Sequence, residues 1–395
     1  MGNNVTQGFH WQSGLKRDTV GIWMWPEIFT HDYESGDRVA IILLDTEGMF
    51  DDSSSCEAAS SIFTLSTMLS SVQCFNVMHN IQADHLEHLR SVTDYGILAS
   101  KGLAGKPFQK LMFLVRDWPN ELETGYGYHD GFLVDEMGAV VNKDQTAHMS
   151  EMGRRIAESF DRVGVFLMPH PGMTVTQENE CAGTLTDIYP EFLDCVKELS
   201  HHLFAPENLT LKQINGESLR AGDLVQYIQA YARVFNSNHL PETDTLFQAT
   251  VEVMDSILIN ECVKFYRLAL GRKIFRKHDG YSPEIVLSMH NHFMARATTM
   301  FQEKAKLGGQ DKLAQLNDGI EKEFRFFNQE NQKKLKLYPV KKKLFVASVL
   351  GAIVGSIFGP LGSLAGYCLS GSLALFSSKN DLEEIETKHA KQIEK

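Results

Sequence analysis

The stretch from Arg38 to Phe50, RVAIILLDTEGMF, constrains the fold of this chain more than any other. It holds six consecutive apolar residues, Val39 to Leu44, that run directly into the D-T-E-G sequence of residues 45–48. An unbroken apolar run of this length, ended by turn-forming residues, predicts a strand that is buried on both faces of a sheet. In open α/β sheets, ligands bind at the carboxyl ends of such strands. We therefore expect a ligand site at Asp45 and Gly48.

This D-x-x-G pattern predicts a nucleotide-phosphate site. Asp45 would hold a metal ion on the phosphates, directly or through water, and Gly48 lets a backbone N–H approach a terminal phosphate closely. In the polar loop upstream, residues 16–19, the hydroxyl of Thr19 is a candidate Mg²⁺ ligand. The order of threonine loop, strand, turn, strand and D-x-x-G is similar to that of a Ras-like guanine-nucleotide domain after its phosphate loop. Ordinary turn chemistry accounts for the same residues, so both interpretations stay open here.

Two further apolar runs, residues 111–115 and 163–168, predict buried strands that end in polar loops. The first runs into Arg116 and Asp117, and an aspartate in this place could accept two N–H donors from a guanine edge. An exposed Arg–Asp turn is the alternative. The second strand ends in a proline-fixed loop that either caps a base or simply turns the chain. The candidate residues of that loop are His170, Pro171 and Gly172.

Helical patterns separate these strands, which predicts a mostly parallel sheet with helices on both faces. The expected helices of this part cover residues 56–69, 83–98, 189–204 and 219–235. After a polar, proline-bearing linker the strand signals stop, and three long helical patterns predict a bundle over residues 245–273, 283–306 and 312–337. The predicted division is a nucleotide domain (1–238), a linker (239–245), a three-helix domain (246–340), a membrane segment (344–376) and a tail (377–395).

Residues 344–376 form a run of 33 residues without a charge, directly after the basic stretch 333–343. One helix over the whole run would be about 50 Å long, well beyond the roughly 30 Å of a bilayer core. The glycines and proline of residues 359–362 favour a hairpin that turns inside the membrane, with a single span over 344–366 as the alternative. The lysines before Leu344 predict that the flanking domains face the cytosol.

The composition limits the class of partner and the compartment. A net charge of −12 argues against a general nucleic-acid binder, which needs a basic surface. The six cysteines show no C-x-x-C or metal-ligand spacing, which is typical of thiols in a reducing compartment.

Several blocks of the sequence resemble the atlastins, members of the dynamin superfamily close to the guanylate-binding proteins. The matching blocks are residues 9–25, 43–51, 113–118, 166–172 and 214–216. The Arg-Asp pair in place of the usual N-K-x-D is distinctive of this branch. The resemblance implies a Ras-like GTPase domain, a three-helix middle domain, an intramembrane hairpin and a cytosolic tail. It also implies GTP hydrolysis coupled to homodimerisation, which tethers and fuses endoplasmic reticulum membranes.

The resemblance assigns a role to each candidate residue. Thr19 is similar to the switch-I threonine and, with Asp45, would hold Mg²⁺, while Asp45 and Gly48 are similar to the switch-II pair. Arg116 and Asp117 resemble the guanine-reading motif, and His170, Pro171 and Gly172 resemble part of the guanine cap. The implied ligands are GTP or GDP with Mg²⁺.

One departure from the family pattern is large. The family carries a G-x-x-x-x-G-K-[ST] phosphate loop before the first switch, and the 395 residues contain no such sequence: Gly105-Lys106 is followed by Pro107. The hydrogen bonds of that loop are worth about 1.5–3 kcal/mol each, so we expect this chain to bind GTP weakly and to turn over little. In the family a central strand precedes this loop, so without it we also expect the neighbouring strands of the sheet to have exposed edges. The alternative function is a non-catalytic membrane adaptor that pairs with full-length family members or shapes tubules of the endoplasmic reticulum.

Overall fold

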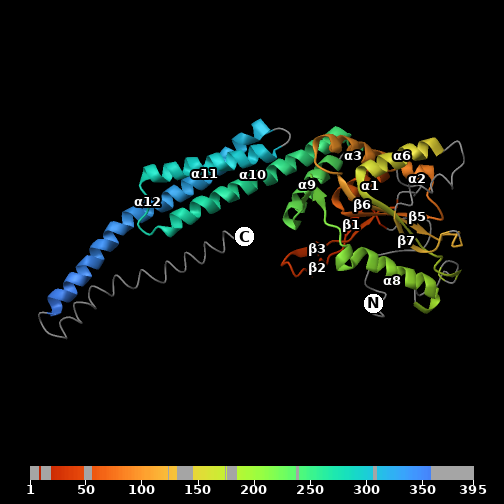
Figure 1. Ribbon diagram of the computed structural model, residues 1–395, viewed down its shortest axis with the longest axis horizontal. Helices are drawn as coiled ribbons and strands as arrows, with labels where there is room; N and C mark the ends of the chain where they lie inside the picture. Colours follow the sequence, from red (N-terminus) through yellow and green to blue (C-terminus); the bar gives the residue numbers. More distant parts are fainter. Residues whose placement is uncertain are drawn as a thin grey trace. The chain divides into compact units, whose positions relative to one another are not determined.

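The computed structural model is shown in Figure 1. It describes residues 19–48, 56–122, 124–130, 146–173, 185–236, 240–305 and 309–356, together with the single positions 9 and 175. The chain divides into two compact units, Met1–Val253 and Met254–Lys395.

A four-stranded sheet lies at the centre of the first unit. Its strands are β5 (Val72–Met78), β6 (Phe108–Arg116), β8 (Phe160–Leu167) and β7 (Gly127–Asp130), in that spatial order. β6 pairs in parallel with β5 and with β8, and β7 is the antiparallel edge strand. The sheet is therefore mostly parallel, as predicted, and the predicted strands at residues 111–115 and 163–168 correspond to β6 and β8.

Helices cover both faces of this sheet. On one face, the ring of Phe63 from α1 (Cys56–Leu69) packs 5.1 Å from that of Phe75 in β5, centroid to centroid. On the other face, Cys195 of α8 (Pro190–Phe204) belongs to a buried cluster with Met112 and Phe166. Successive strand residues point to opposite faces, so α1 and α8 lie on opposite sides of the sheet. This arrangement confirms the predicted layers.

The first unit contains further helices and two short strands. They are α2 (Ala83–Glu87), α3 (Arg90–Gly102), α6 (Thr146–Ser159), η1 (Leu185–Asp187), η2 (Pro206–Asn208), β9 (Gln213–Ile214), β10 (Glu217–Ser218) and α9 (Ala221–Phe235). The single helix expected over residues 83–98 is thus divided into α2 and α3.

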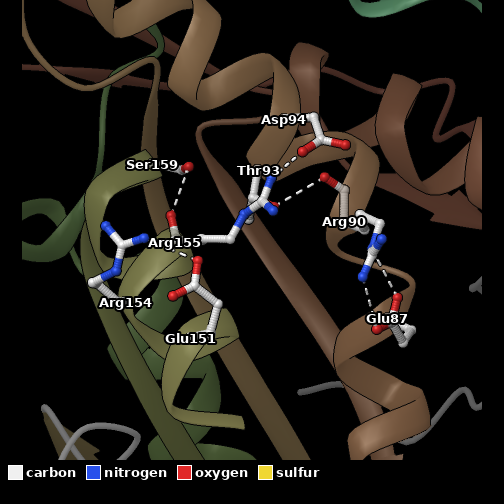
Figure 2. A network of polar contacts seen from close by, with 8 residues as sticks. All are labelled: Glu87, Arg90, Thr93, Asp94, Glu151, Arg154, Arg155 and Ser159. Atoms are coloured by element: carbon white, nitrogen blue, oxygen red, sulfur yellow. Dashed lines mark hydrogen bonds and ion pairs between the residues drawn. The ribbon is translucent and has the colours of Figure 1, made fainter. Parts of the chain in front are cut away.

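Charged side chains line the contact between α3 and α6 (Figure 2). The Arg155 guanidinium of α6 donates to the Asp94 carboxylate of α3, and this ion pair is the one that joins the two helices in the view. Arg154 instead pairs within α6, at 2.9 Å from Glu151. Beside these charges the helices approach closely, because Gly96 of α3 faces Ser159 of α6.

The predicted buried strand over residues 39–44 is wrong. The apolar run is divided into β3 (Arg38–Ile41), which pairs antiparallel with β2 (Phe29–Asp32), and β4 (Leu44–Thr46), which pairs antiparallel with β1 (Ile22–Met24). The chain changes its partner strand between Ile41 and Leu44. Among the described residues each of these short strands has one neighbour, and its residues are half-buried or exposed instead of enclosed on both faces.

β4 and β5 each have an open edge within the described residues. β4 pairs with β1 alone, β5 pairs with β6 alone, and no ladder joins β4 to β5. Helix α1 follows β4 in the chain and contacts both strands. The resemblance led us to expect open strand edges, without assigning them to particular strands.

Three long helices follow, α10 (Thr243–Arg276), α11 (Pro283–Lys304) and α12 (Gly309–Ser356). In the second unit they share a core of fully buried side chains, among them Tyr266, Phe301 and Phe327. Asn331 of α12 closes the turn between α10 and α11, since its side chain exchanges two 2.8 Å hydrogen bonds with the backbone of Tyr281. The three predicted helical patterns are confirmed as helices.

The predicted membrane segment, residues 344–376, begins inside α12, which runs through Pro339 to Ser356. Residues 357–376 and the tail 377–395 lie outside the described residues. Within the part of the chain that is described, none of the helices combines the length and the apolarity that a membrane crossing needs.

Candidate functional site

Thr19 and Asp45, which are 26 residues apart in the sequence, are in direct contact. Pairing of β1 with β4 sets Asp45 opposite Trp23 and brings the segment before β1 alongside. The Thr19 hydroxyl donates to Oδ2 of Asp45 at 2.6 Å. A hydroxyl and a carboxylate side by side are oxygen ligands of the kind that Mg²⁺ prefers, and Mg²⁺ usually takes one or two protein ligands together with phosphate oxygens and water. These two residues fit the predicted metal ion.

Glu47, the third residue of the D-T-E-G sequence, forms hydrogen bonds with Gly21, which lies two residues after Thr19. Its backbone N–H donates to the Gly21 carbonyl at 2.9 Å, and the Gly21 N–H donates to Oε2 of Glu47 at 2.9 Å. Only 5% of Glu47 is exposed. Sequence analysis missed this residue, because a charged side chain in a turn is normally solvated. At Gly48, by contrast, no atom of the described residues beyond its chain neighbours lies within 4 Å of the position that a Cβ would take.

Arg116 ends β6, and Asp117 follows it in the left-handed region with φ of +55°. The next residue is anchored to β8, since the Trp118 N–H donates to the Met168 carbonyl at 3.0 Å. The Met168 N–H in turn donates to the Val115 carbonyl at 2.9 Å. The Asp117 carboxylate has no hydrogen bond or ion pair to any residue that the structure describes. Both of its oxygens are therefore available to accept donors.

The loop of His170, Pro171 and Gly172 lies at the same edge of the sheet, and Pro169 separates it from Met168. The Gly172 N–H donates to Nδ1 of His170 at 3.0 Å, and the Pro171 carbonyl accepts from the Tyr189 N–H at 2.9 Å. Gly172 has φ of +126°, and a Cβ there would lie 3.2 Å from a ring carbon of Tyr189. The loop is thus held in shape and fastened to the start of α8.

The end of β5 contacts the Arg116–Asp117 pair from the other side. The Arg116 Nε–H donates to Oδ1 of Asn76 at 2.7 Å, and Nδ1 of His79 lies 3.2 Å from the Asp117 carbonyl oxygen. Sequence analysis missed both residues because it did not predict β5.

The predicted residues therefore assemble as two groups in the first unit. One group is Thr19, Asp45 and Gly48, and the other is Arg116, Asp117 and residues 170–172. Among the described residues, no hydrogen bond or ion pair joins the two groups. Their convergence on one ligand stays a prediction.

Comparison with known proteins decides the family. The model of the family described as guanylate-binding protein, N-terminal domain, matches residues 3–213, more than half of the chain. The chain belongs to this family. The matched range contains both groups of the guanylate-binding site that the sequence predicts. Through this family the chain resembles GTP hydrolases.

Curated relatives extend the match into the helical part. The chain is 37% identical to Atlastin of Drosophila melanogaster over 370 residues, which cover 92% of this chain and 68% of that protein. It is 33% identical to Atlastin-2 of Homo sapiens over 374 residues, covering 93% and 64%, and 31% identical to Atlastin-1 of Bos taurus over 366 residues, covering 91% and 66%. The chain thus spans about two thirds of the length of these relatives. The atlastin resemblance predicted from the sequence is confirmed.

Proposed function

We propose that the first unit is a Ras-like nucleotide domain that binds a guanine nucleotide with Mg²⁺ and hydrolyses GTP. The observation that carries the proposal is the 2.6 Å contact between Thr19 and Asp45, which sets a hydroxyl and a carboxylate, two oxygen ligands of the kind that Mg²⁺ takes, side by side. Family membership and the predicted switch pattern support the same reading.

The roles of the side chains follow from their chemistry. A bound Mg²⁺ would neutralise charge on the β- and γ-phosphates, and Thr19 and Asp45 are the residues to hold it. Gly48 has no side chain that would keep a terminal phosphate oxygen away from its backbone N–H. The Asp117 carboxylate, which has no partner among the described residues, can accept both N–H groups of a guanine edge, and adenine, which presents no such pair, would leave it unpaired. The loop of residues 170–172 would cover the base.

We further propose that the chain of 395 residues binds nucleotide weakly, because it contains no G-x-x-x-x-G-K-[ST] sequence. A micromolar affinity corresponds to about 8 kcal/mol. Several charge-assisted hydrogen bonds of about 1.5–3 kcal/mol each make up a large share of that sum.

The proposal for the whole chain is an atlastin-like protein of the endoplasmic reticulum membrane, whose nucleotide cycle drives homodimerisation, tethering and fusion. In this proposal residues 1–238 are the nucleotide domain, 239–245 the linker and 246–340 the three-helix domain, all facing the cytosol. Residues 344–376 would form the membrane hairpin, with 377–395 as the tail. The uncharged run and the name shared by the relatives support it.

A fluorescent GTP analogue titrated onto the full chain, with Mg²⁺ and with a chelator, tests the nucleotide proposal. We expect binding that Mg²⁺ strengthens in the wild type. Thr19→Val and Asp45→Asn should each lose most of the Mg²⁺ effect while keeping the affinity measured in chelator. Equal affinities with and without Mg²⁺ in all three proteins would contradict the assigned metal site.

A non-catalytic adaptor is the second candidate, favoured by two observations. The sequence lacks the phosphate-loop motif, and the core of the second unit is built without any residue of the nucleotide site. As an adaptor the chain would pair with full-length family members or shape tubules. Co-purification with a full-length relative, equal in the presence and absence of nucleotide, would support it, and a monomer without such a partner would contradict it.

A further inference from the structure

The ends of β5 and β6 carry two non-glycine residues in the left-handed region. His79, directly after β5, has φ of +62°, and Asp117, directly after β6, has φ of +55°. This conformation is unfavourable for L-residues with a side chain, and it persists where the surroundings hold it. Here the two unfavourable residues lie on neighbouring strands and contact each other.

His79 holds the backbone of the Arg116–Asp117 pair at two points. Its N–H donates to the Arg116 carbonyl at 2.8 Å, which continues the β5–β6 ladder by one residue. Its ring Nδ1 lies 3.2 Å from the Asp117 carbonyl oxygen. A carbonyl oxygen only accepts, so Nδ1 is the nitrogen that carries the hydrogen.

Asn76 contacts the side chain of Arg116. Residues 76 and 78 of β5 share a face with Leu114 and Arg116 of β6, since the register sets Asn76 beside Leu114 and Met78 beside Arg116. The Arg116 guanidinium only donates, so the Asn76 amide presents its oxygen, at 2.7 Å from Nε. This contact fixes the direction in which Arg116 leaves the strand.

We propose that Asn76 and His79 are positioning residues for guanine recognition, which hold Arg116 and Asp117 so that both oxygens of the Asp117 carboxylate meet the base. The inference rests on the proposed function of Asp117. On the far side the loop is already anchored by the 3.0 Å hydrogen bond from Trp118 to Met168. The β5 contacts supply the second anchor, and bidentate acceptance requires the carboxylate to keep one orientation.

The readout is discrimination between GDP and inosine diphosphate, which lacks the 2-amino group. A well-placed Asp117 accepts two hydrogen bonds from guanine and one from hypoxanthine, so a misplaced carboxylate lowers the affinity for GDP more than that for inosine diphosphate. Complete loss of a hydrogen bond to an ionised carboxylate corresponds to a change in affinity of about tenfold or more, so a displaced carboxylate that weakens this bond without breaking it corresponds to about a fivefold change. A residue that merely supports the fold would lower both affinities equally.

Both diphosphates are titrated onto the full chain and its variants by calorimetry. His79→Gly removes the ring and tolerates the left-handed backbone, and Asn76→Ala provides a second variant with an unchanged backbone. Each should lower the ratio of GDP to inosine diphosphate affinity by about fivefold. His79→Asn tolerates the same backbone and keeps an N–H donor, so it should restore much of the ratio. Asn215→Gly, at φ of +57° in the turn between β9 and β10, is the matched control and should leave the ratio unchanged.

Combination with Asp117→Asn separates this inference from the proposed function. In that background His79→Gly should have no further effect on the ratio. If Asp117→Asn itself leaves the ratio unchanged, or if no GDP binding is detected at millimolar concentration, the proposed function fails and the inference with it. The inference alone is overturned if Asp117→Asn lowers the ratio but Asn76→Ala and His79→Gly do not. Such variants would either lower the affinities for both diphosphates equally or leave both unchanged.

Discussion

At the scale of single residues, Gly96 sets how closely α3 and α6 can approach. A Cβ at position 96 would lie 2.2 Å from Oγ and 2.7 Å from Cβ of Ser159. We therefore expect Gly96→Ala to lower the free energy of unfolding by about 1–3 kcal/mol, as overpacking does. Gly153→Ala in α6 is the control, because no described atom outside its own stretch of helix lies within 4 Å of its Cβ position, and it should stabilise by up to about 1 kcal/mol. Urea denaturation measures both, and equal effects would contradict the close helix contact.

Lys212 gives a prediction for the pH dependence of stability. Its Nζ donates to the Ser70 carbonyl at 3.0 Å, and burial lowers the pKa of Lys212 to about 7. In the unfolded chain the pKa is about 10.4. Between pH 7 and about 10 the unfolded state thus binds a proton that the folded state does not, and this group makes the free energy of unfolding rise with pH.

Lys212→Met removes that group, so the stability of the variant relative to the wild type should fall as pH rises from 7 to about 10. Below pH 7 both states hold the proton and the difference should be constant. Denaturation curves at a series of pH values give the difference directly. A difference that does not change with pH across this window would show that the buried amine stays charged.

The identity of several candidate site residues could be predicted from the sequence, but the contacts that they make with residues distant in the sequence could not. Asp45, Asp117 and His170 were found because polar residues after apolar runs are visible in sequence. The roles of Glu47 and His79 depend on tertiary geometry: one is a buried carboxylate that accepts a backbone N–H, and the other a left-handed residue that reaches the next strand. Neither feature has a sequence pattern of its own.

At the scale of elements, three helices of the first unit meet at one hydroxyl. Oγ1 of Thr250 in α10 donates to the Leu246 carbonyl at 2.9 Å. It lies 3.0 Å from the hydroxyl of Tyr95 in α3 and 2.9 Å from that of Tyr231 in α9. A hydroxyl has one hydrogen and two lone pairs, so both tyrosines donate to it and all three groups are satisfied. Burial raises the pKa of Tyr95 to about 12, which keeps its hydroxyl a donor.

Thr250→Val keeps the shape of the side chain and removes the acceptor of two buried donors. We expect it to lower the free energy of unfolding by about 2 kcal/mol or more, since each unpaired buried hydroxyl costs about 1–3 kcal/mol. Adding Tyr95→Phe and Tyr231→Phe removes the stranded donors and should recover part of the loss. Chemical denaturation of the single and triple variants measures this. A triple variant less stable than Thr250→Val would contradict the hydroxyl network.

The sequence patterns predicted the helices better than the strands. The observed bounds of α1 are the same as those predicted from its periodicity, and the bounds of α8 and α9 differ from the predicted ones by at most two residues. β5 escaped prediction because its buried position 73 is a glutamine, which accepts hydrogen bonds from Ser66 and Ser70, while Cys74 beside it is exposed. The run at residues 39–44 misled because apolarity alone does not show that the chain changes its pairing partner midway.

At the scale of the whole molecule, the described part consists of a sheet-centred first unit and a helical second unit. Both groups of candidate site residues lie in the first, within the range that matches the guanylate-binding protein family. The threonine segment, α1, β6, β8 and the loop after β8 could be predicted because each has a local pattern, whereas β5, β7 and α6 were not predicted. The partition of the sheet into separate ladders could not, since strand pairing is not a local property.

The central claim is that Asp117 reads the base of a guanine nucleotide, and a change of base preference tests it most directly. Replacement of the carboxylate by an amide in Asp117→Asn exchanges one acceptor for a donor, which matches the C2 carbonyl of xanthine instead of the 2-amino group of guanine. Affinities of GDP and xanthosine diphosphate, measured by calorimetry on the full chain and on the variant, decide the matter. We expect the wild type to prefer GDP and Asp117→Asn to prefer xanthosine diphosphate. The same preference in both proteins would contradict the account.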